Sequence, residues 1–329
     1  MQTARSSLGR STPPAPAPLV ARELELVEER LAGLLHSREG RLTEIANYLI
    51  GSGGKRVRPA VALLIFRACG GVAVADAVDV AVALELIHSA SLLHDDIIDA
   101  SAKRRGRDSA LRKFGLADTL VTGDFLFSRA FQLCGRFDER LINWAIDACV
   151  SLTEGEIMQS RFRHNPAVAF ADYVEIVERK TASLFQQGAR TAATLAQAPP
   201  DLVEDVAQCA LHVGITFQMI DDLLDVSGTE DVIGKPVGLD VREGNPSLPV
   251  VLAVADDPEA RRLFAKSDLT DGEFDTLLAR LRRPAIINEA HRLAMEHADR
   301  ARTALRRIPE SPYRQHLLDL VDQLVDRPA

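Results

Sequence analysis

The sequence predicts an all-α protein, on three observations. From Leu19 onward, apolar residues recur at three- and four-residue spacing, as at Leu24, Val27, Leu31 and Leu34, which is the period of an amphipathic helix. Strand patterns are nearly absent. Hydrophobic residues make up 47% and charged residues 26% of the 329 positions, and no shift in composition divides the chain. We therefore expect one large helical unit.

The elements follow in order along the chain. Residues 1–18 are rich in Ser, Thr, Pro and Ala and lack acidic residues, which predicts a disordered tail before a domain over 19–329. Residues 227–247 are glycine-rich, polar and too long for a simple connector, as in loops that close over a site. Helical patterns cover residues 59–69, 74–100, 117–134, 139–163, 170–197 and 202–226, and resume from 248 to the end.

Composition excludes several classes of function. The net charge of −8, without a basic stripe along the sequence, argues against binding to a nucleic acid. No run approaches the roughly 18 consecutive apolar residues of a membrane span, so we expect no transmembrane segment. The cysteines form no zinc-binding spacing and fit reduced thiols in a cytoplasmic protein: Cys69, Cys134, Cys149 and Cys209.

Two acidic runs of the form D-D-x-x-D stand in otherwise apolar sequence. Helical residues four apart share a face, so the first and last aspartates of each run point the same way. We call each run a carboxylate claw. The first claw is Asp95, Asp96 and Asp99, and the second claw is Asp221, Asp222 and Asp225.

The claws predict a bound cation. Like charges at this spacing weaken a helix, and carboxylates among apolar residues are costly unless something positive neutralises them. Hard oxygen ligands without Cys or His at matching spacing favour Mg²⁺, which takes one or two carboxylates plus substrate phosphates. Two claws would then hold one polyphosphate from both sides. The alternative for one run alone is a solvated helix face, but its repetition in the same apolar setting argues against that.

Basic segments lie close to the first claw in the sequence. Residues 51–59, Gly-Ser-Gly-Gly-Lys-Arg-Val-Arg-Pro, feed a helix N-terminus, where an anion is favoured, although a basic inter-helix turn is the alternative. Their spacing matches no nucleotide-binding fingerprint. Residues 103–107, Lys-Arg-Arg-Gly-Arg, follow the claw, and arginine suits phosphate because it bonds in a bidentate way. His88 lies seven residues before Asp95, on roughly the same face.

These motifs resemble those of the trans-isoprenyl diphosphate synthases, also called polyprenyl synthetases, of the medium- and long-chain type. The resemblance covers nearly everything after the first 18 residues. Its segments stand in the family's order: Gly-Gly-Lys55-Arg56-Val-Arg58-Pro, His88-Ser-Ala-Ser-Leu-Leu-His-Asp95-Asp96-Ile-Ile-Asp99, Arg104-Arg105-Gly, Gly-Asp124-Phe, Lys180-Thr181, Phe-Gln218-Met-Ile-Asp221-Asp222-Leu-Leu-Asp225 and Gly-Lys235-Pro. It implies an all-α isoprenoid synthase fold, a single bundle of antiparallel helices around a central active-site cavity, in a homodimer.

The resemblance also implies residue roles. Mg²⁺, three ions with substrate bound, would be held by Asp95, Asp99 and Asp221, supported by Asp96, Asp222 and Asp225. The allylic diphosphate would be held by Arg104, Lys180, Thr181, Gln218 and Lys235, and the isopentenyl diphosphate by Lys55, Arg58, His88 and Arg105. The six aspartates, Lys180 and Lys235 form the catalytic set. Two positions depart from the family: Asn245 replaces a second lysine after the loop's Gly-Lys, and Ala102 replaces a residue that is often polar.

The implied activity is Mg²⁺-dependent head-to-tail condensation of an allylic diphosphate with isopentenyl diphosphate. A class I terpene cyclase has one aspartate-rich claw but needs no second diphosphate site, which the basic set Lys55, Arg58 and Arg105 opposes. A regulatory subunit of a heteromeric synthase would be expected to lose claw aspartates, and this chain keeps all six. A farnesyl or geranylgeranyl diphosphate synthase is the alternative for product length.

Product length is predicted from the side chains before the first claw. Ala90 and Ser91 are small, where short-chain members of the family often carry a bulky aromatic residue. The resemblance therefore implies an all-trans product longer than twenty carbons, in the range of thirty to fifty. On the helix over 117–134, Phe127, Phe131 and Cys134 share one face and are candidates for the floor of the product tunnel, with ordinary core residues as the alternative.

Overall fold

The structure, a computed structural model, describes residues 18–51, 53–228 and 237–326. Apart from Pro18, the predicted tail lies outside the described residues. The described chain is helical except for one two-stranded hairpin, so the all-α prediction is confirmed. The elements are η1 (Pro18–Val20), α1 (Ala21–Leu34), α2 (Gly40–Ile50), α3 (Val57–Ala68), α4 (Val74–Ile98), β1 (Lys103–Arg104), β2 (Arg107–Asp108), α5 (Ala110–Phe114), α6 (Leu116–Cys134), α7 (Glu139–Arg161), α8 (Phe170–Val177), η2 (Glu178–Ala182), α9 (Ser183–Leu195), α10 (Pro200–Ser227), α12 (Leu239–Arg242), α13 (Leu248–Asp256), α14 (Pro258–Phe264), α15 (Asp271–Leu281), α16 (Pro284–Leu305) and α17 (Pro312–Val325).

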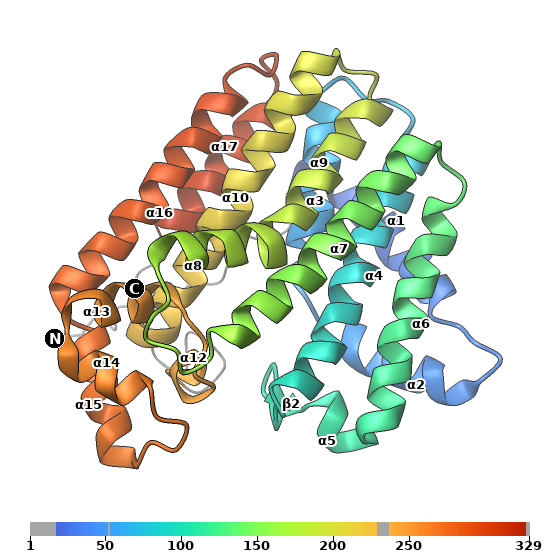
Figure 1. Ribbon diagram of the computed structural model, residues 1–329. Coiled ribbons are helices and arrows are strands. Elements are labelled where there is room, and N and C mark those ends of the chain that lie inside the picture. Colours follow the sequence, from blue (N-terminus) through green and yellow to red (C-terminus); the bar gives the residue numbers. More distant parts are fainter. Residues whose placement is uncertain (1–17, 52, 229–236, 327–329) are drawn as a thin grey trace, which may run out of the picture.

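Two long helices, α4 and α10, carry the claws through the middle of the bundle (Figure 1). Helix α4 packs against α1, α3, α6 and α9, and α10 packs against α9 and α16. Helix α4 is long and apolar enough to cross a membrane by length and composition, but 78% of its most apolar window is buried inside the molecule. Helix α3 is buried along most of its length, from Pro59 to Phe66.

The predicted helix over 170–197 is divided by a π-helical turn, η2, which contains Lys180 and Thr181. Such turns widen a helix and occur often at functional sites, because they change the direction of the side chains they carry. Helix α7 approaches this turn closely at Gly155, where an added Cβ would lie 2.6 Å from the backbone nitrogen of Lys180. A side chain at position 155 would therefore displace the turn.

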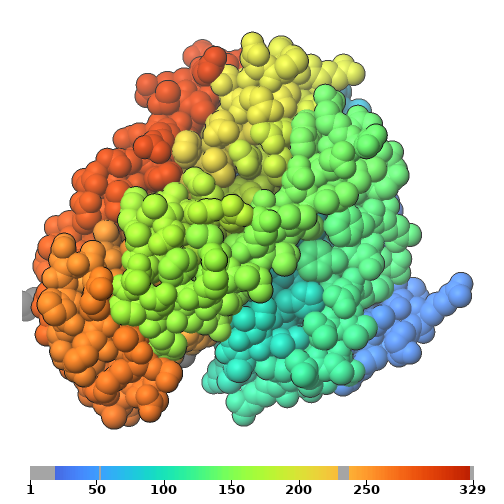
Figure 2. All heavy atoms as spheres, in the orientation of Figure 1, coloured from blue at the N-terminus to red at the C-terminus, as the bar shows by residue number. Residues whose placement is uncertain are grey.

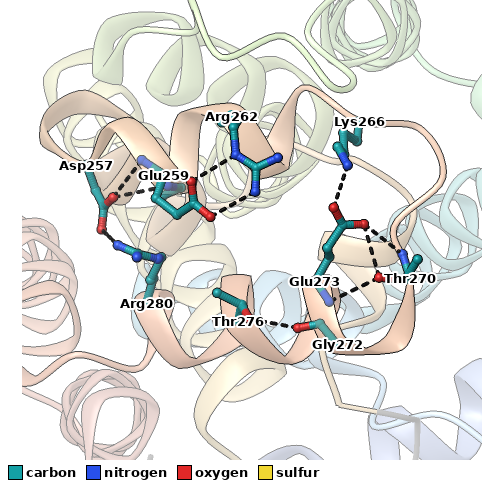
Figure 3. Close-up of polar contacts among 10 residues, drawn as sticks. Asp257, Glu259, Arg262, Lys266, Thr270, Gly272, Glu273, Thr276 and Arg280 are labelled. Carbon is teal, nitrogen blue, oxygen red and sulfur yellow. Dashed lines mark hydrogen bonds and ion pairs between the residues drawn. The ribbon is translucent and has the colours of Figure 1, made fainter.

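The hydrophobic residues form two clusters. One joins α1, α3, α4, α6, α9 and α17, and the other joins α8, α13, α14 and α15 to the claw-bearing half of α10. The second group is stabilised at its helix starts (Figure 3). Asp257 accepts hydrogen bonds from the backbone of Glu259 (2.9 Å) and Ala260 (3.1 Å), and Thr270 and Glu273 form a reciprocal capping box. The helices that pack against the second claw's half of α10 thus have capped N-termini.

Candidate active site

The first claw lies at the C-terminal end of α4, and each of its carboxylates faces a different cation. Asp96 is fully buried and accepts hydrogen bonds from Arg104 Nε (2.5 Å) and from the backbone nitrogen of Ala110 (3.3 Å). Asp95 lies 3.8 Å from Lys180 Nζ, and Asp99 forms an ion pair with Arg163. Burial raises the pKa of Asp95 to about 6, although Lys180 opposes the shift. Ionised Asp95 is therefore under-neutralised and favours a further cation.

The second claw is organised by buried hydrogen bonds around its middle aspartate. Asp222 accepts from Tyr173 Oη (2.8 Å), Gln218 Nε2 (2.8 Å) and the backbone nitrogen of Leu248 (2.9 Å). Burial nevertheless raises its pKa above the ordinary value. Thr181 Oγ1 donates to Gln218 Oε1 at 3.0 Å, which links the π-helical turn to this claw. Asp221, beside Asp222, is half-buried.

A cavity of about 150 Å³ lies between the two claws. Asp99 lines it from one side and Asp222 from the other, with Lys180, Thr181 and Gln218 between them. Burial lowers the pKa of Lys180, but Asp95 and Glu156 raise it more, so this ammonium group stays charged. Figure 2 shows a notch at the lower edge of the molecule, between the part formed by α8 and α13–α15 and the part formed by the end of α4 and α5. The claws thus face one site from opposite walls.

The donor set of this site fits Mg²⁺. The claws supply carboxylate oxygens, the ligands that hard divalent ions prefer. Among the described residues, no group of three or more His, Cys, Asp or Glu side chains is arranged to hold a metal ion unaided. A metal here must take further oxygens from elsewhere, as Mg²⁺ does when it shares a substrate's phosphates. Asp95, Asp99 and Asp221 are the residues that would hold it.

A basic cluster lies beside the first claw, around the buried Glu85 of α4. The carboxylate of Glu85 interacts electrostatically with three arginines, Arg56, Arg58 and Arg105. Arg56 Nη1 contacts it at 2.7 Å. Burial lowers the pKa of Arg58 to about 10, so it remains charged near neutral pH. Burial, reinforced by Arg58 and Arg105, lowers the pKa of His88 well below its ordinary value, so its imidazole is neutral. The cluster can bind an anion.

The backbone around this cluster explains its glycines and its hairpin. An added Cβ on Gly54 would lie 2.6 Å from Arg56 Nη1 and 3.4 Å from Arg105 Nη1, so both guanidinium groups lie close to the turn. Arg105 and Gly106 have φ of 51° and 75° between β1 and β2, the sign that a tight two-residue hairpin turn requires. The hairpin thereby places Arg104 on Asp96 and Arg105 beside Gly54.

A second, apolar cavity of about 30 Å³ lies deeper in the bundle. Ala83 and Ile87 line it from α4, and they share a helix face with Ser91 and Asp95, at about 12 to 18 Å from the claw. Its other lining residues come from α4, α6, α7, α9 and the turn before α7: Val80, Leu84, Cys134, Phe137, Leu141, Ala145, Ala148, Leu184, Gln187, Gly188 and Thr191. Ala90 is fully buried on α4 beside this face.

The predicted tunnel floor stays a prediction, and its three candidates on α6 lie in different surroundings. Of the three candidates on α6, only Cys134 lines the apolar cavity. Phe127 packs near His94, with ring centroids 5.8 Å apart, and Phe131 is 37% exposed, so neither side chain reaches the cavity. The helical period identified a shared face but not the direction in which each side chain points. Phe137, in the turn after α6, lines the cavity together with Cys134.

Comparison with known proteins identifies the family. The family model described as polyprenyl synthetase matches residues 39–278. The chain is 33% identical to the all-trans-nonaprenyl-diphosphate synthase (geranyl-diphosphate specific) of Rhodobacter capsulatus, covering 94% of this chain and 96% of that protein. It is 31% identical to the octaprenyl diphosphate synthase of Escherichia coli, covering 94% and 97%. The chain belongs to the polyprenyl synthetase family.

The fold of this polyprenyl synthetase agrees with that of solved relatives. The crystal structure of a polyprenyl synthase from Caulobacter crescentus, complexed with calcium and isoprenyl diphosphate, superposes with a TM-score of 0.90 at 32% identity. The superposition covers 94% of this chain and 96% of the Caulobacter chain. The isoprenoid synthase fold is therefore confirmed along with the family.

The remaining motif residues have different surroundings. Lys235 lies outside the described residues, so its predicted contact stays a prediction. Lys55 is exposed on the turn before α3, and Asp124 is exposed on α6. Asn245 is buried and lines the cavity between the claws, with Nδ2 donating to Glu243 Oε2 at 3.0 Å. An amide thus stands in this cavity at the position where the family resemblance implies a second lysine.

Sequence reasoning missed several residues that shape the site. Glu85 interrupts an apolar stretch of α4, and a charge in such a stretch signals a buried ion pair. Glu156 is buried and pairs with Lys180, whereas Glu154 is exposed and pairs with Arg179. Tyr173 had no signal in the sequence, because its role depends on the packing of α8 against α10.

Proposed function

We propose that this chain is a polyprenyl diphosphate synthase, which elongates an allylic diphosphate by head-to-tail condensation with isopentenyl diphosphate. One observation carries the proposal: two carboxylate claws on α4 and α10 face one cavity, with the charged Lys180 between them and the basic cluster beside them. A terpene cyclase needs the claw but not a second anion site. The similarity to the Caulobacter polyprenyl synthase bound to isoprenyl diphosphate and to the Rhodobacter nonaprenyl diphosphate synthase supports the same substrate class.

The residues divide the reaction between two anion sites. Lys180, Thr181, Gln218 and Arg104 bind the allylic diphosphate, and Arg58, Arg105, Lys55 and neutral His88 bind the isopentenyl diphosphate. The allylic carbon–oxygen bond breaks and both its electrons leave with pyrophosphate. Asp95, Asp99 and Asp221 would hold Mg²⁺, three ions with substrate bound, and the metal would supply positive charge to this leaving group. Lys180 adds its own positive charge on the same side.

The remaining steps need positioning and exclusion of water. The double bond of isopentenyl diphosphate attacks the allylic cation, a carbon–carbon bond forms, and a proton passes to the departing pyrophosphate as the new double bond appears. Water would capture the cation, so the reacting carbons must lie in a dry, apolar space. Farther along α4, Ile87, Leu84 and Ala83 provide an apolar surface for the growing chain.

The product is proposed to be an all-trans polyprenyl diphosphate of thirty to fifty carbons. Ala90 and Ser91 place no aromatic ring one turn below Asp95, and the apolar cavity continues along α4 past Ile87. The names of the nonaprenyl and octaprenyl relatives point to the same range. A farnesyl or geranylgeranyl product is the alternative that the assay below distinguishes.

The enzyme is proposed to work as a cytoplasmic homodimer whose product passes to a membrane. Large apolar side chains are exposed on the neighbouring helices α6 and α7: Leu116, Leu120, Val121, Phe131, Ile146, Val150 and Ile157. Their spacing on α7, every four to seven residues, forms one stripe, and a stripe of this kind supports a contact with a second copy. Sedimentation at micromolar concentration should give twice the 35.9 kDa chain mass.

Product analysis tests the proposed activity. The purified chain is incubated with farnesyl diphosphate, labelled isopentenyl diphosphate and Mg²⁺, with and without chelator, and the dephosphorylated products are separated by chromatography. We expect linear products longer than twenty carbons that disappear with chelation. Cyclic hydrocarbons would favour a terpene cyclase instead, and activity that requires a second protein would favour a heteromeric subunit. Asp221→Ala serves as the inactive control.

A further inference from the structure

One cation at the first claw comes from outside the motifs. Asp95 faces Lys180 and Asp96 faces Arg104, both of which belong to motif segments. Asp99 instead pairs with Arg163, which lies in the turn over 162–169 between α7 and α8. Arg163 Nη1 also donates to the backbone oxygen of Ile98 at 3.4 Å. This arginine therefore holds the last residues of α4 as well as the carboxylate.

The partner of Arg163 is a carboxylate that the substrate cavity needs. Asp99 lines the cavity between the claws, whereas Asp96 is fully buried against Arg104. The side chains of Arg163 and Asp99 are 22% and 14% exposed, so water screens their ion pair only in part. A cation placed on Asp99 from the cavity meets the guanidinium of Arg163 at the same carboxylate.

The turn that carries Arg163 is hydrogen-bonded to the segment after α12, on the second-claw side of the cavity. The backbone nitrogen of His164 donates to the oxygen of Gly244 at 3.0 Å, and His164 Nδ1 lies 3.3 Å from the oxygen of Phe264. An added Cβ on Gly244 would lie 2.3 Å from the His164 ring, so the two segments are in close contact. Figure 1 shows the connection between α7 and α8 beside α12. The next residue, Asn245, lines the cavity from the second-claw side.

We propose that Arg163 is the internal counter-ion of Asp99 and competes there with Mg²⁺. This inference rests on the proposed function, because it takes the first claw to bind Mg²⁺ together with a diphosphate. A guanidinium group and a divalent ion on one carboxylate repel each other, so metal binding weakens or breaks the Arg163–Asp99 pair. Because the turn over 162–169 also contacts Gly244, this exchange of cations links the first claw to the wall that carries Asn245.

Metal affinity measures this competition without a turnover assay. Mn²⁺ serves as the probe in titrations followed by electron paramagnetic resonance, with pyrophosphate present at a fixed, saturating concentration. For Arg163→Gln we expect the apparent Kd for Mn²⁺ to fall about two- to fivefold, the upper part of the range for a partly screened ion pair. The rise in Tm caused by Mg²⁺ and pyrophosphate should also be larger in the variant than in the wild type.

Matched variants separate this effect from a general change of charge. Arg161→Gln removes an exposed arginine two residues away, which makes no ion pair among the described residues and should leave the Kd unchanged. Arg163→Lys keeps a cation and should stay near the wild type. Arg163→Met, another neutral replacement, should repeat the result of Arg163→Gln and provides the test if that variant fails to fold.

Three results would overturn the proposal. A wild-type Kd in both neutral variants would mean that Arg163 does not compete with the metal. A higher Kd would mean that Arg163 supports the metal-bound state. Failure of the wild type to bind Mn²⁺ with pyrophosphate would overturn this proposal and the proposed function together, whereas the first two results leave the proposed function intact.

Discussion

A bulky side chain at Ala83 is expected to shorten the product. Ala83 lies twelve residues before Asp95, about 18 Å along α4, and it lines the apolar cavity. A phenyl ring there overfills packed space at a cost of roughly 1–3 kcal/mol. At 1.36 kcal/mol for each factor of ten, growth past the ring should slow by about 5- to 150-fold. Ala83→Phe should therefore release chains shorter than those of the wild type at similar rates for the early condensations.

The assay is chromatography of dephosphorylated products from wild type and variants under equal turnover. Phe137→Ala opens the same cavity from the other side and should lengthen the product. Phe131→Ala, on the exposed face of α6, is the matched control and should leave the length unchanged. Ala90→Phe, one turn below the claw, should shorten the product further, to about fifteen or twenty carbons. Unchanged length in a folded Ala83→Phe variant, or a longer product from Phe131→Ala, would refute the assignment of this cavity.

Three further perturbations test other parts of the account. Asp221→Ala should lower turnover at least about a hundredfold, because metal-borne charge stabilisation is worth several kcal/mol, and thermal melting should show no loss of stability because repulsion is relieved. Arg58→Ala should raise KM for isopentenyl diphosphate more than KM for the allylic substrate; the reverse pattern would mean that the two sites are exchanged. The hydrogen bond from Lys266 lowers the pKa of Glu273 to about 2, so its contribution to stability is present above pH 4.5 and is lost as pH falls from there toward 2. In urea unfolding, the free energy of unfolding of Glu273→Gln should lack this fall at low pH, whereas the exposed-site control Glu139→Gln should behave as the wild type. If Glu273→Gln instead shows the same pH dependence as the control, the capping box does not contribute.

The sequence predicted the claws because their geometry needs only a helix. Four-residue spacing places Asp95 with Asp99 on one face wherever the helix lies, and the same holds for Asp221 and Asp225. The order of the motifs, which resembles that of the family, then predicted that the two helices face one cavity. Glu85 was detectable as a charge within an apolar stretch, because such a charge requires a buried partner.

Other features depend on contacts between distant segments. The π-helical turn at Lys180 is fitted to Gly155 of another helix, and Arg163 reaches Asp99 from a turn without any repeated pattern. Phe131 is a second example of a side chain whose surroundings the sequence pattern did not predict. Its spacing from Phe127 and Cys134 predicted a shared face, but of these three only Cys134 lines the apolar cavity, which Phe137 lines as well. Periodicity describes one helix, whereas orientation toward a cavity depends on its neighbours.

The most direct test of the central claim is a crystal structure with metal, isopentenyl diphosphate and a thiolo analogue of an allylic diphosphate that cannot ionise. Anomalous scattering from Mn²⁺ would locate the metal ions independently of the substrate density. We predict three ions at the allylic diphosphate, ligated by Asp95, Asp99 and Asp221, with isopentenyl diphosphate on Arg58, Arg105 and His88. Metal bound by one claw alone, or a single diphosphate with the basic cluster empty, would contradict the account.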